Sequence, residues 1–357
     1  MHTTRHWILL TFTLTLIACA VDTGGSALSG PPDGALDGGE DAEATRPDSG
    51  PSGSGDAAVE ADARLPDAPP FSLADPQPGT PEQYDLDAPA SHIDQLVFAL
   101  SASQGRDLNG DGRIDNAAGG LLGTINDLAE ADLNQRLSEQ VANGSVSLGL
   151  TWIPRGASLE HGDVELHFLH LRFTDDPARF DVYADSFLDG TRTPAVRFAG
   201  HTEGGELDAG PSTLDVVLPL FGASVELRLE RTLIRGLLVQ RDGGVAVTDG
   251  DLAGYLGLAS VIGALNAYTG PSGQCACLGL PQGLIDPVGG LGQLRCRPPG
   301  AECGEGACQT LANLCSTVLP GVTAQADADL DGDGTRESLS VYLRFQAAPA
   351  RLGGIVR

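Results

Sequence analysis

The sequence contains no lysine: all 21 basic residues of the 357-residue chain are arginine. This absence excludes chemistry that needs a lysine amine, such as the phosphate-binding lysine of P-loop proteins and Schiff-base catalysis. The motifs G-x-S-x-G and H-E-x-x-H and a glycine-rich phosphate loop are also missing from the sequence. We therefore assign no catalytic residue and expect a non-enzymatic protein.

Positive charge is scarce throughout, and the formal net charge is −27. Residues 91–357 alone carry 33 acidic residues against 18 arginines, with no basic stripe. A nucleic-acid partner would need such a stripe to release counterions from the phosphates, and an anionic lipid surface would also attract one. The composition therefore argues against both kinds of partner.

Long hydrophobic runs are also lacking. The apolar run 7–18 is interrupted by threonines and is shorter than the roughly 20 residues that cross a bilayer. Because it follows Arg5 near the start of the chain, residues 1–18 are predicted to be a signal peptide. An exported protein is expected.

The run ends in Leu-Ile-Ala-Cys at 16–19, which resembles the lipobox of bacterial lipoproteins. The resemblance implies cleavage before Cys19, a diacylglycerol on its sulfur and a further acyl chain on its amine. Two or more chains make a stable membrane anchor. Residue Ala20 is not the aspartate that retains some lipoproteins at the inner membrane, so we expect attachment to the outer membrane or cell surface.

Aromatic residues make up 5% of the chain and almost none lie in 19–90, where 11 of the 23 prolines are found. This segment has 15 acidic residues against Arg46 and Arg64. It cannot bury enough apolar surface to offset its ordering entropy, and its charges repel one another. We expect a disordered linker at 19–90 and a globular domain at 91–357.

The globular part shows mainly the two-residue periodicity of β-strands. Segment 95–101 fits a strand or a helix opened by Ser91. The other expected strands are 145–153, 163–174, 179–188, 194–200, 213–220, 223–232, 235–244 and 338–347. In one of them Val225, Leu227 and Leu229 alternate with charged residues, which predicts one face toward a core. The pattern indicates a mainly β sandwich or partly open barrel with a few peripheral helices.

Two segments have helical spacing of apolar residues. The first is 123–144, which ends in Asn143-Gly144, a helix-stop signal. The second is 248–268, with Leu252, Leu256 and Ile262 on one face. We expect one helix in each segment.

Six cysteines follow Cys19, all in 270–316, a segment rich in glycine and proline: Cys275, Cys277, Cys296, Cys303, Cys308 and Cys315. An even number in an exported protein predicts three disulfides. A zinc site is the competing interpretation, but no histidine lies in the segment. Cys275 and Cys277 are too close to pair without strain, so each is expected to reach a different downstream cysteine. The disulfides are expected to hold a loop-rich excursion without a core of its own.

Two acidic loops, 107–115 and 329–337, share the spacing D-x-[DN]-x-D-G-x-x-[DE]. Alternate residues of such a loop can turn oxygen atoms inward, and the glycine in sixth place permits a sharp bend. An all-oxygen ligand set favours calcium over zinc or copper. The candidate ligands are Asp107, Asn109, Asp111, the carbonyl of Arg113 and Asp115 in the first loop, and Asp329, Asp331, Asp333, the carbonyl of Thr335 and Glu337 in the second.

These loops resemble the calcium loops of EF-hands, dockerins and thrombospondin type-3 repeats. The resemblance departs at the twelfth place, where EF-hands have a bidentate glutamate and this chain has Ala118 and Ser340. Water, Asp327 or another distant residue would have to complete the shell. The missing ligand predicts weak binding, with a Kd of roughly 10⁻⁴–10⁻³ M.

Three histidines, His161, His167 and His170, lie close in the sequence, but strand geometry separates them. We expect solvated strand faces there rather than a shared metal site. The lipobox, acidic linker, cysteine cluster and paired acidic loops together resemble surface lipoproteins of myxobacteria-type organisms, a likeness that carries no activity. The expected function is a calcium-stabilised, membrane-anchored binding or scaffold module. One alternative is a carrier of a lipid or other apolar ligand, which a large apolar cavity in the structure would favour. The other is a calcium-supported hydrolase.

Overall fold

The computed structural model describes residues 69–357 apart from 130–131, 157, 221–222, 242–243, 289–293 and 305. The predicted signal peptide, Cys19 and most of the predicted linker lie outside the described residues. The strands are β1 Ala90–Phe98, β2 Leu148–Pro154, β3 Gly162–Phe173, β4 Arg179–Tyr183, β5 Val196–Glu203, β6 Glu206–Leu220, β7 Ala223–Arg241, β8 Gly244–Gly257, β9 Ile285–Pro287, β10 Leu294–Cys296 and β11 Ser338–Val356. The α-helices are α1 Ala117–Ala129, α2 Leu133–Ala142, α3 Leu258–Thr269 and α4 Gly306–Ala324.

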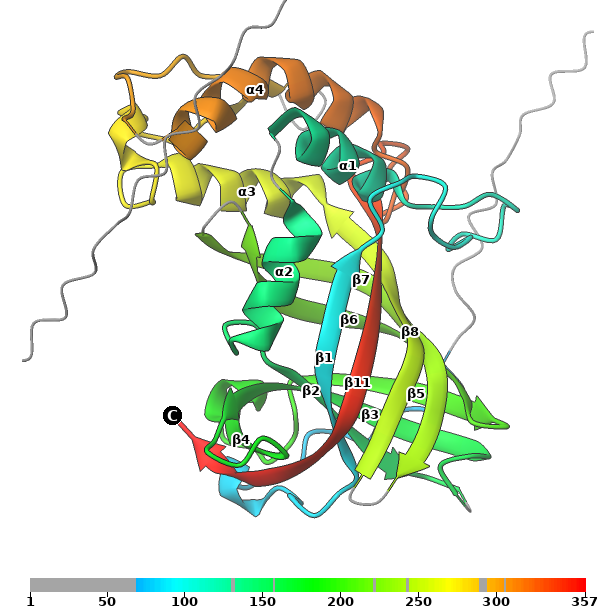
Figure 1. Cartoon of the computed structure of the whole chain (residues 1–357). Helices are drawn as coiled ribbons and strands as arrows, with labels where there is room; N and C mark the ends of the chain where they lie inside the picture. Colours follow the sequence, from blue (N-terminus) through cyan, green and yellow to red (C-terminus); the bar gives the residue numbers. More distant parts are fainter. Residues whose placement is uncertain are drawn as a thin grey trace, which may run out of the picture. The chain divides into compact units, whose positions relative to one another are not determined.

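Eight of the described strands close into an antiparallel barrel (Figure 1). The order is β1-β2-β3-β5-β6-β7-β8-β11, and β11 pairs back with β1. Helices α1, α3 and α4 lie at one end of the barrel, whereas β4 and the carboxyl terminus lie toward the other (Figure 1). The expectation of a mainly β domain with a few peripheral helices is confirmed, and the arrangement is a barrel.

Helix α2 fills a gap in the barrel wall near the helical end. Strand β1 pairs with β2 only over Ala90–His92, so the rest of its edge is free of strand pairing on that side. The side chain of Asn134 on α2 pairs with the last residue of this edge, because its oxygen accepts from the Phe98 amide at 2.8 Å and its nitrogen donates to the Phe98 carbonyl at 3.0 Å. Leu137 and Val141 turn the apolar face of α2 into the core.

The opposite half of the barrel is filled by side chains. Trp152 and Phe198 are fully buried there, together with Leu166 and Ile234. The Trp152 indole donates to the Ser91 hydroxyl at 2.9 Å, so the one polar group of this ring is satisfied. This half of the barrel interior is a packed core.

Residues 69–89, which the sequence places in the linker, pack on the outside of the barrel. The Tyr84 hydroxyl hydrogen-bonds to Thr151 at 2.6 Å and to His167 at 2.8 Å. His167 also contacts Glu165 at 3.1 Å, and both are buried. His167 therefore does not lie on a solvated face as expected, because Tyr84 covers it.

The helix expected at 123–144 is two helices. Asp132 interrupts it, because this residue has a left-handed backbone and caps α2 by accepting from the Gln135 amide at 3.2 Å. The aspartate offers the first amides of α2 an acceptor, which favours a new helix start. Leu133, Leu137 and Val141 are buried as the spacing predicts, whereas the side chains of Ile125, Leu128 and Ala129 lie outside the description.

The prediction of a helix at 248–268 is also wrong for the first half of that segment. Residues 244–257 form β8, which pairs with β7 on one side and β11 on the other, and only Leu258–Thr269 is helical. Both faces of β8 are covered: Leu252 and Leu256 face the barrel interior, while Ala253 and Tyr255 pack in a separate outer cluster. Burial on both faces blurs the two-residue pattern, so the apolar spacing resembles that of a helix.

The three expected disulfides are present: Cys275–Cys308, Cys277–Cys303 and Cys296–Cys315. Cys275 and Cys277 reach different downstream cysteines, as predicted. The surrounding segment is not a coreless excursion, because Leu278, Leu280 and Leu284 join the main core and α4 carries Cys308 and Cys315. The disulfides thus fasten the helical end of the barrel.

No helix among the described residues combines the length and apolarity needed to cross a membrane.

Candidate functional site

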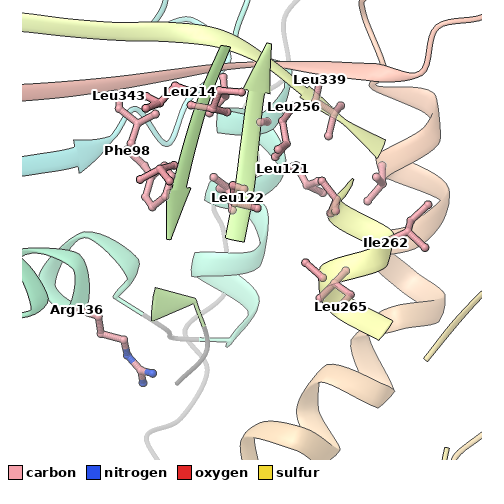
Figure 2. Close-up of a pocket in the computed structure, with 18 of the residues that line it drawn as sticks. Phe98, Leu121, Leu122, Arg136, Leu214, Leu256, Ile262, Leu265, Leu339 and Leu343 are labelled. Carbon is pink, nitrogen blue, oxygen red and sulfur yellow. The ribbon is translucent and has the colours of Figure 1, made fainter. Parts of the chain in front are cut away.

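A cavity of about 420 Å³ occupies the half of the barrel nearest the helices. Inward-facing residues of seven described strands of the barrel form its wall, among them Phe98, Leu214, Leu256 and Leu343. Leu121, Ile262 and Leu265 face the same space from α1 and α3 (Figure 2). Further lining residues from α4 are Leu311, Leu314, Leu319 and Val322.

The lining of this cavity is almost wholly apolar. Only Arg136 and Thr310 bring a polar side chain to it among the described residues. Both are exposed, and Leu122, Leu265 and Leu311 are only half-buried. The cavity therefore reaches the surface between the helices.

Among the described residues that line the cavity there is no histidine or acidic residue for general acid-base chemistry. An apolar space of this kind can hold a ligand by excluding water.

The two acidic loops have the same hydrogen-bond pattern, position for position. In each loop, the carboxylate of the first residue accepts hydrogen bonds from the backbone amides of the fourth and sixth residues. The side chains of the third and fifth residues each accept a hydrogen bond from the backbone amide two residues later. The carboxylate of the ninth residue accepts a hydrogen bond from the backbone amide of the second residue. These acceptors are Asp107, Asn109, Asp111 and Asp115 in the first loop, and Asp329, Asp331, Asp333 and Glu337 in the second. The fourth- and sixth-place glycines have φ of 76° to 87°, a conformation that favours glycine.

The second loop brings its acids together. One carboxylate oxygen from each of Asp329, Asp331, Asp333 and Glu337 lies within 4.8 Å of the others. The Glu337 Oε2 atom is buried and has no hydrogen-bond partner within the described part of the chain. A buried carboxylate oxygen without a donor is costly. This donor set fits a hard cation such as calcium.

The first loop is the weaker candidate. Its equivalent of Asp331 is Asn109, so it has one acid fewer, and Asp107, Asp111 and Asp115 are not grouped as closely within the described residues. The amides of Arg113 and Thr335, whose carbonyls are predicted ligands, donate to the fifth-place aspartates at 2.8 and 2.7 Å.

The residues in the twelfth place of the two loops, Ala118 and Ser340, contribute to packing and hydrogen bonding within the fold. Ala118 is buried and lines the cavity. The Ser340 hydroxyl contacts the Asp327 carboxylate and accepts from the Ala117 amide at 2.8 Å. Because the Ser340 amide also donates to Asp327 at 2.8 Å, this aspartate is turned toward Ser340 and does not belong to the Asp329 group.

Each acidic loop joins a strand of the barrel to a helix of its cover. The first lies between β1 and α1, and the second between α4 and β11. Strands β1 and β11 are paired neighbours, and α1 contacts both α4 and β11. The two loops therefore lie at adjacent junctions between barrel and cover, a relationship that appears only in the folded chain.

Burial, hydrogen bonds and nearby charges shift the pKa values of several groups around the two loops. Burial raises the pKa of Asp115; the hydrogen bond from Leu108 opposes this effect and the charge of Asp327 reinforces it. Burial likewise raises the pKa of Tyr255, and the charges of Asp115 and Asp327 add to the shift. The hydrogen bond from the Gly334 amide lowers the pKa of Asp329. The charge of Asp327, two residues before the second loop, thus acts on Asp115 of the first loop.

Comparison of the chain with models of protein families, with curated proteins and with solved structures gives no match.

Proposed function

We propose that this protein binds an apolar ligand in the helix-covered half of its barrel and acts as a carrier or receptor for it. The observation that carries this proposal is the cavity of about 420 Å³ with its apolar lining. Ligand sites have volumes of roughly 300–1,000 Å³ and are mostly apolar, and apolar cavities of this kind bind apolar molecules in preference to water. Among the three functions that the sequence leaves open, this cavity favours the carrier.

Binding of a neutral, solvent-sensitive dye such as Nile red to the purified protein tests the proposal. We expect saturable binding with a blue shift in emission. A tryptophan at Val261, a half-buried cavity residue on α3, should block the dye, whereas one at Ala259, exposed on the same helix, should not. If Val261→Trp folds and binds the dye as tightly as Ala259→Trp does, the cavity is not the binding site.

We further propose that calcium binds the two acidic loops and braces the helices over the cavity. The grouping of the four acids in the second loop, the unpartnered Glu337 oxygen and the placement of both loops at the strand–helix junctions support it. Calcium there would offset repulsion among the acids and hold α1 and α4 against the barrel. Chelation should lower the melting temperature and calcium, but not an equal ionic strength of sodium chloride, should restore it. Equal melting curves in all three conditions would refute the role.

The amino-terminal residues support the proposal that the chain is exported and anchored by lipid at Cys19 in the outer membrane or at the cell surface. The three disulfides agree with folding in an oxidising compartment. Mass spectrometry of the amino-terminal peptide should find diacylglycerol on Cys19. Cys19→Ser should release the protein from the membrane fraction, and retention of this variant would contradict the anchor.

A further inference from the structure

We propose that the ligand of the cavity is an amphiphile with an apolar tail and an anionic head, a long-chain carboxylate, and that Arg136 binds the head. This inference rests on the proposed apolar-ligand function and names the ligand class. Arg136 is the one charged side chain among the described residues that line the cavity, and it is exposed at the margin. Figure 2 shows it extending from α2 beside the apolar group rather than within it.

Within the described part of the chain no carboxylate lies at ion-pair distance from Arg136, although Asp132, which caps α2, and Glu139 on α2 are suitably spaced. Asp132 instead caps the Gln135 amide at 3.2 Å, and Glu139 accepts from the Gln135 side chain at 2.9 Å. The acids nearest in sequence are thus engaged with other groups.

Other arginines of the described chain do pair with carboxylates, as Arg235 does with Asp208 at 2.7 Å and Arg297 with Asp286 at 2.9 Å. What distinguishes Arg136 from the other unpaired arginines among the described residues is its place on the cavity lining. A neutral head would gain only an ordinary hydrogen bond from the Arg136 guanidinium, and a cationic head would be repelled by it. A carboxylate suits it, because the planar guanidinium can donate two parallel hydrogen bonds.

The position of the arginine determines how the ligand lies. The tail enters the apolar cavity, where a charged head would be left without partners. The head stays at the margin beside Arg136, partly in water. The negative net charge of the chain does not prevent this pairing, because charges beyond about 8–10 Å are largely screened at physiological ionic strength.

Displacement of Nile red by chain-matched ligands tests the inference. The protein is the full chain carrying Cys19→Ser, which avoids detergent, with its disulfides formed. The ligands are hexadecanoate and hexadecanol, both below their aggregation limits. We expect the carboxylate to bind about tenfold more tightly than the alcohol, and added salt to weaken only the carboxylate.

Three variants assign the preference to Arg136. Arg136→Gln should lower carboxylate affinity about tenfold and leave alcohol affinity unchanged. Arg136→Lys should retain part of the preference, and Arg192→Gln, at an exposed arginine outside the cavity, should retain all of it. Equal affinities for both ligands, or an Arg136→Gln variant that weakens both alike, would overturn the assignment while the apolar-ligand function stands. If neither ligand nor the dye binds the protein with an unaltered cavity, the proposed apolar-ligand function is refuted.

Discussion

The Ala117 amide, at the first residue of α1, donates to the hydroxyl of Ser340 on β11 at 2.8 Å. The two residues are 223 positions apart in the sequence. Each lies just beyond one acidic loop, so this hydrogen bond joins the helix that follows the first loop to the strand that follows the second. Ser340 is fully buried and also contacts Asp327, which makes it the link between the two junctions.

Replacing Ser340 by alanine should therefore destabilise the protein by about 1–3 kcal/mol, because a helix amide and the half-buried Asp327 carboxylate both lose a partner. Urea unfolding followed by circular dichroism measures the change. Ser138→Ala, which removes an exposed hydroxyl on α2, is the control and should change stability by less than about 0.5 kcal/mol. Equal stabilities of the two variants would show that the buried hydroxyl is not a structural link.

The two acidic loops should differ in calcium affinity, since Asn109 in the first takes the place of Asp331 in the second. Asn109→Asp should strengthen the weaker site severalfold, and Asp331→Asn should weaken the stronger one, because affinity depends on the number of ligand charges. Either residue can keep its hydrogen bond to the amide two positions on. Calorimetric titration resolves the sites, and unaltered binding heats in both variants would contradict the assignment.

Stability should fall in mild acid because of His92. Burial lowers its pKa to about 4, and its ring stacks on Phe180 with Nε2 unpartnered among the described residues. In the unfolded chain this histidine binds a proton near pH 6.5, whereas in the folded protein it binds one only near pH 4. Between these two pH values the unfolded state binds more protons, so the free energy of unfolding decreases as the pH falls. His92→Phe should fit the aromatic stack and flatten the decrease. A variant whose melting temperature falls with pH as steeply as before would exclude His92 as the cause.

Removing the Cys296–Cys315 disulfide should affect ligand binding as well as stability. This bond ties α4 to β10, and Cys315 lines the cavity. Alanine at both positions should cost about 3 kcal/mol and weaken dye binding. The matched control is alanine at Cys277 and Cys303, away from the cavity lining, which should cost a similar amount but spare binding in the folded protein. Identical dye affinities in the two double variants would contradict a role for this disulfide in shaping the cavity.

Much of the fold could be predicted from local patterns. Strand β3 has nearly the bounds predicted at 163–174, and Leu227 and Leu229 are buried as the β7 pattern predicts. Turn chemistry was equally local: the glycines of both acidic loops have the left-handed backbone that the spacing requires. The errors lie where tertiary contacts compete with local preference. β8 is buried on both faces, and α4 begins within a cysteine- and glycine-rich segment whose loop-like composition hides the helix.

The sequence by itself determined the β-rich class, the three disulfides and the paired acidic loops, because each depends on residue type and spacing along the chain. The tertiary structure alone decided that the barrel is filled at one half and hollow at the other. Alternation shows which side chains point inward, but whether they meet depends on the diameter of the barrel and on what packs at its ends. It also decided that Arg136 stands at the cavity margin with no acidic partner among the described residues, since Asp132 and Glu139 contact Gln135 instead.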